Sequence, residues 1–202
     1  MNILRPSTRA IALAVAALIF APLITWAADV DVFEFIPAGG RTLMAAALAG
    51  KPPADEVRAL VTGKRSREEW LKYLRQHSQS ITGLQRLKEK ELLTLADYLS
   101  FNMPLPAAQI PANLAQANWG KVLPPDGRDF ALNYCQSCHI ITVVVTQDRT
   151  RDAWLGSLGK PSHVQIKLNR EQREALVGYL VLNAAIPIDD VPEELRAGGA
   201  TY

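Results

Sequence analysis

The stretch NYCQSCHI, from Asn133 to Ile140, contains both cysteines of the chain and one of its three histidines. Cys135 and Cys138 are separated by two residues, and His139 follows the second cysteine directly. Two thiols and an imidazole so close together can bind a metal, hold a covalent group or react with each other. The chemistry of this stretch decides which fold the rest of the chain is expected to form.

Three simple explanations for the two cysteines fit the sequence poorly. A disulfide would leave His139 without a role. A structural zinc site needs four protein ligands, and His139 is too close in sequence to Cys138 to complete one easily. A thioredoxin-like site needs a strand before it, whereas DGRDFALNY, residues 126–134, predicts a helix with an aspartate or glycine start.

The pattern C-x-x-C-H is the attachment sequence for c-type haem. Two thiols on one helical turn add to the two vinyl groups of the porphyrin, and the histidine that follows supplies an axial imidazole to the iron. We therefore expect one covalent haem c on Cys135 and Cys138, with His139 as an iron ligand.

The first 27 of the 202 residues resemble a secretory signal peptide. Arg5 and Arg9 precede an apolar run that Pro22 interrupts, and small residues at its end predict cleavage after about Ala27. We expect a periplasmic protein with no membrane span in the mature chain. Removing these residues leaves 20 basic and 20 acidic side chains, so no surplus of positive charge indicates nucleic-acid binding.

Motifs recur along the mature chain in the same order. RSREEWL (Arg65–Leu71) and LLTLADYLSFNMP (Leu92–Pro104) are followed by RTRDAWL (Arg149–Leu155) and ALVGYLVLNAAIP (Ala175–Pro187). This order predicts a duplication. The proline-rich residues 104–117 are expected to be the linker.

Most local patterns are helical. Ser66 with Glu69, and Asn169 with Gln172, have the spacing of capping boxes. Leu176, Tyr179, Leu180 and Asn183 are expected on one helix face. The strand-like exception is IITVVV, residues 140–145, which we expect to be an extended segment against a core. The expected fold class is all-α.

The second copy resembles the class I cytochrome c family. Gly127 stands where that family has a glycine that lets its last helix cross closely, Tyr179 and Leu180 resemble its aromatic-leucine pair, and Trp154 resembles its tryptophan near a haem propionate. The resemblance implies two cytochrome c-like helical domains. Residues 28–117 would form a degenerate haem-less domain with its linker, and residues 118–202 the haem-binding domain.

The resemblance also implies a sixth iron ligand, usually methionine, in the loop before the last helix. Met103 is the last methionine of the chain, so we expect His163, which lies in that loop, to take this place. An open iron, or Met103 reaching over from the linker, are the alternatives.

An electron-transfer role is favoured over an enzymatic one. The expected function is to carry single electrons, in partnership with a periplasmic dehydrogenase or another cytochrome. The alternative is a haem sensor or enzyme with an open iron that binds or reduces a small ligand such as NO or peroxide.

Overall fold

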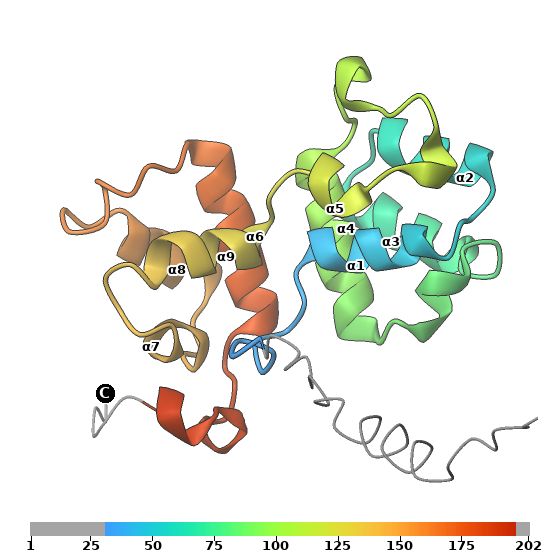
Figure 1. The fold of residues 1–202 in the computed structure, drawn as a ribbon. Helices are drawn as coiled ribbons and strands as arrows, with labels where there is room; N and C mark the ends of the chain where they lie inside the picture. The colour runs from blue at the N-terminus through green and yellow to red at the C-terminus, as the bar shows by residue number, and fades with distance from the viewer. Residues whose placement is uncertain (1–30, 197–202) are drawn as a thin grey trace, which may run out of the picture. The chain divides into compact units, whose positions relative to one another are not determined.

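The structure, a computed structural model, describes residues 31–196 (Figure 1). None of these residues is in a β-strand, which confirms the expected all-α class. The expected signal peptide and its cleavage site lie outside the described residues. Among the helices of residues 31–196, none combines the length and the apolar character that crossing a bilayer requires.

The α-helices are α1 (Gly40–Ala49), α2 (Ala54–Thr62), α3 (Arg67–Gln76), α4 (Glu89–Asn102), α5 (Trp119–Val122), α6 (Gly127–Phe130), α7 (Thr142–Val145), α8 (Arg151–Leu158) and α9 (Arg170–Asn183). A π-helical stretch, η4 (Ala131–Cys135), continues α6. Short 3-10 helices are η1 (Thr82–Arg86), η2 (Ala107–Gln109), η3 (Leu114–Gln116), η5 (Ile188–Asp190) and η6 (Glu193–Leu195).

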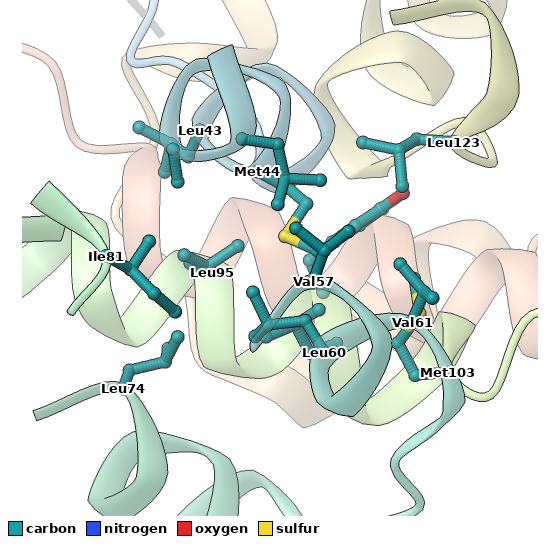
Figure 2. Close-up of a cluster of buried hydrophobic side chains, with 14 of the residues drawn as sticks. Leu43, Met44, Val57, Leu60, Val61, Leu74, Ile81, Leu95, Met103 and Leu123 are labelled. Atoms are coloured by element: carbon teal, nitrogen blue, oxygen red, sulfur yellow. The ribbon is translucent and has the colours of Figure 1, made fainter. Parts of the chain in front are cut away.

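Two hydrophobic clusters organise these helices. The first cluster is built mainly by α1 to α4, whose apolar side chains converge in Figure 2, and Met44, Leu60 and Trp70 are fully buried in it. The second cluster is built mainly by α6 to α9, with Leu176 and Val177 fully buried. We refer to residues 31–116 as the first half and to residues 119–196 as the second half.

Each half has a glycine against a tyrosine of its last long helix. A β-carbon on Gly40 would lie 2.1 Å from that of Tyr98, and a β-carbon on Gly127 would lie 2.2 Å from that of Tyr179. Non-bonded carbon atoms do not approach each other so closely. Only glycine therefore permits α1 to pack on α4, and α6 on α9, at this separation. The two halves thus share the close helix crossing expected at Gly127.

Helices α3 and α8, which precede α4 and α9, also make similar contacts in the two halves. Ser66 caps α3 and Thr150 caps α8, each accepting a hydrogen bond from the third backbone N–H of its helix. One helical turn later Trp70 and Trp154 are buried, and an arginine guanidinium lies over each indole ring. The expected capping boxes at Ser66 and Asn169 are both present.

The proline-rich segment after α4 packs against the first cluster. Leu105 and Leu114 are buried there, and the Leu105 N–H donates to the Val61 carbonyl at 2.8 Å. The second half repeats this bond from Ile186 to Val145, at 3.0 Å. Residues 104–117, expected as a linker, therefore have a counterpart after α9, because apolar side chains between the prolines anchor both segments.

The segments that precede α1 and α6 are exchanged between the halves. The Tyr179 hydroxyl donates to the Pro37 carbonyl at 2.6 Å, and the Tyr98 hydroxyl donates to the Pro124 carbonyl at 3.0 Å. Ile36 is buried in the second cluster, and Leu123 in the first. Each half therefore needs a short piece of the other to complete its core.

The expectation for residues 140–145 was wrong in its secondary structure. Thr142–Val145 forms α7, with the Val145 N–H donating to the Ile141 carbonyl at 3.0 Å. Ile141 and Val145 are buried in the second cluster, and this packing outweighs the β-propensity of the sequence.

Candidate functional site

The cysteine segment begins from a firmly capped helix. Asp126 accepts a hydrogen bond from the Asp129 N–H at 2.9 Å, and the Asp129 carboxylate accepts one from the Asp126 N–H at 2.9 Å. The helix then widens into η4, which ends at Cys135. Such π-helical turns are frequent at functional sites, since the extra residue re-aims the side chains that follow.

A single turn of backbone holds Cys135, Cys138 and His139. The N–H groups of Cys138 and His139 both donate to the Cys135 carbonyl, at 3.3 and 3.1 Å. Cys135 is half-buried, whereas Cys138 and His139 are exposed. The two thiols are thus one helical turn apart on the chain, with the imidazole directly after the second.

Both cysteines are free thiols, not joined to each other. Burial raises the pKa of the Cys135 thiol to about 11, and the neighbouring Cys138 adds to the rise. In a dithiol redox site the first, attacking cysteine has a lowered pKa, because the thiolate is the nucleophile. The environment of Cys135 therefore disfavours the thioredoxin-like alternative.

His163 lies near His139, although the two are far apart in sequence. Their ring centres are 6.1 Å apart and their planes are inclined by 46°. Metal–imidazole bonds are about 2.0–2.1 Å long and a ring centre lies about 1.1 Å beyond its nitrogen, so two imidazoles on opposite sides of one metal ion have centres about 6 Å apart. The pair has the spacing of two axial ligands.

The surroundings of His163 leave one ring nitrogen for a metal. The Ser162 hydroxyl is 3.4 Å from Nδ1 of His163, within hydrogen-bond distance. The turn itself is closed by the His163 N–H, which donates to the Lys160 carbonyl at 2.8 Å. Nε2 is therefore the ring nitrogen of His163 that has no hydrogen bond among the described residues.

An open cleft of about 390 Å³ lies beside the cysteine segment. Cys138, His139 and Ile140 form one wall. Phe33 and the pair Glu194–Leu195 contribute from the opposite ends of the described chain. These three residues could not be predicted from the sequence, because no local motif indicates that segments so distant in sequence reach the cleft.

Apolar side chains flank both histidines. Ile140, next to His139, is 50% exposed, and Val164, next to His163, is 56% exposed. Each histidine of the pair therefore has an exposed apolar neighbour in sequence.

Trp154 is a core residue of the second half, 5% exposed. Its indole Nε1 is buried without a hydrogen-bond partner among the described residues, but the same is true of Trp70 in the first half. Arg65 and Arg149 lie over these two rings at 4.4 and 5.2 Å. Because the feature recurs where no attachment sequence exists, it belongs to the shared packing and does not single out Trp154 as a propionate donor.

Met103, considered above as a sixth ligand, is buried in the first cluster (Figure 2). Its side chain is 6% exposed and contributes to the core of the first half. The structure therefore brings His163, and not Met103, to His139. Within residues 31–196 no three histidine, cysteine or acidic side chains are grouped as a metal site would require, so the four ligands of a zinc site are not assembled there.

No protein-family model, no curated protein and no solved structure matches this chain. The donor set itself fits a c-type haem. It provides two thiols on one turn, an adjacent imidazole and a second imidazole whose ring centre is 6.1 Å from that of the first.

Proposed function

We propose that this protein is a periplasmic monohaem cytochrome c that carries single electrons. Cys135 and Cys138 hold the haem, and His139 and His163 bind its iron. The observation that carries the proposal is the 6.1 Å spacing between the ring of His139, which belongs to the attachment sequence, and the ring of His163. The partner is a redox protein such as a periplasmic dehydrogenase or another cytochrome, and export depends on residues 1–27.

The chain's own groups account for attachment and retention. Cys135 and Cys138 would hold the haem, each by adding its thiol across one vinyl group, with the sulfur on one vinyl carbon and the hydrogen on the other. No oxidant is required for this step. When bound, the haem supplies an iron that gains and loses one electron. His139 and His163 would bind that iron and leave no position for an added ligand, which suits electron transfer rather than ligand binding.

The helix crossing supports a cytochrome c-like arrangement for residues 118–202. In the family that this part resembles, a glycine of the first helix lets the last helix cross closely, and Gly127 makes such a contact with Tyr179. The same crossing at Gly40 and Tyr98 supports a second, related domain in residues 28–117.

The first half lacks the chemistry for haem. Counted from Gly40 as Cys135 is from Gly127, the matching positions are Leu48, Lys51 and Pro52. None of these provides a thiol or an imidazole, and Leu48 is buried in the first cluster. We infer that this half is a haem-less relative of the second, whose core is filled by its own side chains.

A polar network centred on Glu56 joins α2 to α3 in the first half. The Glu56 carboxylate is hydrogen-bonded to His77 Nδ1 at 2.8 Å and accepts bonds from the Ser80 and Tyr73 hydroxyls at 2.7 and 2.8 Å. These bonds tie α2 to α3 and to the loop that follows it.

Optical spectroscopy with a potentiometric titration tests the proposal. The full chain is produced with haem-maturation machinery, and spectra are recorded oxidised, reduced and after addition of CO. We expect low-spin spectra in both states, one reversible one-electron transition and little CO binding. Without a thioether ligand the potential should be lower than in cytochromes with histidine and methionine ligands.

Other outcomes would separate the alternatives. A high-spin spectrum that changes with CO would replace electron transfer by the sensor or enzyme function with an open iron. A purified, fully exported protein without haem absorption would contradict the whole proposal.

A further inference from the structure

Arg173, the fourth residue of α9, binds the backbone of the loop that carries His163. Its guanidinium donates hydrogen bonds to four carbonyl oxygens of residues 158–168: Leu158 at 3.1 Å, Val164 at 3.3 Å, Ile166 at 2.8 Å and Leu168 at 3.2 Å. The first and last of these carbonyls lie at the two ends of the loop, and the other two follow His163 closely. One side chain thus fastens the loop at both ends and beside the candidate ligand.

The chemistry of arginine suits this role. A guanidinium offers five N–H donors in a rigid plane and stays charged at every relevant pH. Its hydrogen bonds are charge-assisted and stronger than those between neutral groups. Lysine carries the same charge on a single nitrogen and cannot reach four separate carbonyls at once.

The first half shows that the fold does not require such a residue. Helices α4 and α9 have the same length, and the fourth residue of α4 is Leu92. Leucine has no donor, and the loop before α4 instead contains η1. The arginine is therefore found in the half that has the cysteines and His163, and is replaced by leucine in the half that lacks them.

We propose that Arg173 is a positioning residue that holds His163 at axial distance from His139 and so keeps the iron six-coordinate. This inference rests on the proposed function. Arg173 acts through the backbone of residues 158–168 and does not itself touch the haem. Without it, the loop would spend part of its time away from His139, and a coordination position would open.

The test compares holoprotein variants by CO binding and by hydrogen–deuterium exchange. Arg173→Ala removes all four hydrogen bonds, and Arg173→Lys keeps the charge but not the planar set of N–H donors. Arg170→Ala is the matched control, because Arg170 is an exposed arginine at the start of the same helix. His163→Ala shows the spectrum of a fully opened iron.

We expect Arg173→Ala to increase the CO-reactive fraction of ferrous haem about tenfold or more, as loss of a charge-assisted hydrogen bond can do. Amide exchange in residues 158–168 should accelerate in the same variant. Arg173→Lys should fall between wild type and Arg173→Ala, and Arg170→Ala should match wild type. The covalent haem content should be equal in all of them.

Several results would overturn the inference. If Arg173→Ala keeps the wild-type CO response although His163→Ala becomes CO-reactive, Arg173 does not position the ligand. If wild type is already open, His163 is not a ligand and the inference fails while haem attachment stands. A wild-type protein without haem would instead mean that the proposed function has failed.

Discussion

Tyr179 crosses Gly127 so closely that a β-carbon on the glycine would lie 2.2 Å from the β-carbon of the tyrosine and 2.7 Å from the Ala175 carbonyl oxygen. Both obstacles belong to the rigid part of α9, so neither can move out of the way as the tip of a flexible side chain could. The packing of α6 on α9, and with it the start of the cysteine segment, depends on this absence of a side chain.

Gly127→Ala should therefore destabilise the protein. Forcing one methyl group between packed helices costs about 1–3 kcal/mol, and denaturant unfolding monitored by circular dichroism would measure the loss. Gly156→Ala is the control, because a β-carbon at Gly156 in α8 meets nothing within 4 Å. There the gain in helix propensity should stabilise by about 0.4–1 kcal/mol. Equal effects at the two sites would refute the close crossing.

Asp126 caps two helices from different halves. One carboxylate oxygen accepts from the Asp129 N–H of α6 at 2.9 Å, and the other from the Arg41 N–H of α1 at 2.8 Å. Asp126→Ala should lose about twice the roughly 1 kcal/mol of an ordinary N-cap, while Ser66→Ala, which uncaps α3 alone, should lose about half as much. Chemical denaturation of both variants decides it, and a smaller loss at Asp126 than at Ser66 would contradict the shared cap.

Asp97 should give the stability a characteristic pH dependence. Burial raises the pKa of this carboxyl, and Arg67, 3.7 Å away, only partly offsets the rise. An acid whose folded pKa lies above its unfolded value of about 3.9 stabilises the folded state at low pH, and this contribution is lost as pH rises through the folded pKa. Asp97→Asn replaces the carboxyl by an amide that does not ionise, so the variant does not lose this stability as the pH rises.

The variant should therefore gain stability relative to wild type as the pH rises above about 4, the pKa of an unfolded aspartate. Urea unfolding at several pH values measures this difference, with Asp148→Asn at an exposed position as the comparison. A difference between Asp97→Asn and wild type that stays constant, or that shrinks as pH rises, would show that the buried carboxyl does not titrate in this way.

Phe33 should shield the cleft beside Cys138 and His139, where we propose that the haem is held. The residue lines the cleft with Cys138 and His139, and its carbonyl accepts a hydrogen bond from Arg128 at 2.9 Å. Phe33→Ala should admit water, which favours the more highly charged ferric iron. The ferric-to-ferrous ratio at fixed ambient potential should then rise by up to about tenfold, or about 59 mV for one electron.

Phe35→Ala is the matched control for this measurement. Phe35 lies in the same segment and packs on the same second cluster, but it does not line the cleft. Potentiometric titration should show a lowered potential for Phe33→Ala alone. Equal shifts in the two variants would mean that loss of packing, and not exposure of the cleft, changes the potential.

Much of the local structure could be predicted because it depends on neighbours in sequence. The boxes at Ser66 and Asn169 lie where their spacing indicates, and the buried face of α9 carries Tyr179 and Asn183 as expected. The approach of His163 to His139 was also expected, but from the family resemblance rather than from any local pattern.

The errors and omissions have physical causes that act over long distances. The residues of α7 favour strands by themselves, and only their burial in the second cluster makes them helical. The exchange of the segments before α1 and α6 depends on hydrogen bonds from Tyr98 and Tyr179 to carbonyls far away in sequence. The hydrogen bonds from Arg173 to residues 158–168 could not be predicted either, because they depend on how that loop folds back on α9.

The most direct test of the central claim is the intact mass of the exported protein, produced with haem-maturation machinery and compared with a Cys135→Ala/Cys138→Ala variant. The account predicts that the wild-type mass exceeds that of the processed polypeptide by one haem, that the pyridine haemochrome has the c-type band, and that the double variant carries no covalent haem. A wild-type mass equal to the polypeptide alone, or lower by the two hydrogens lost in forming a Cys135–Cys138 disulfide, would contradict it.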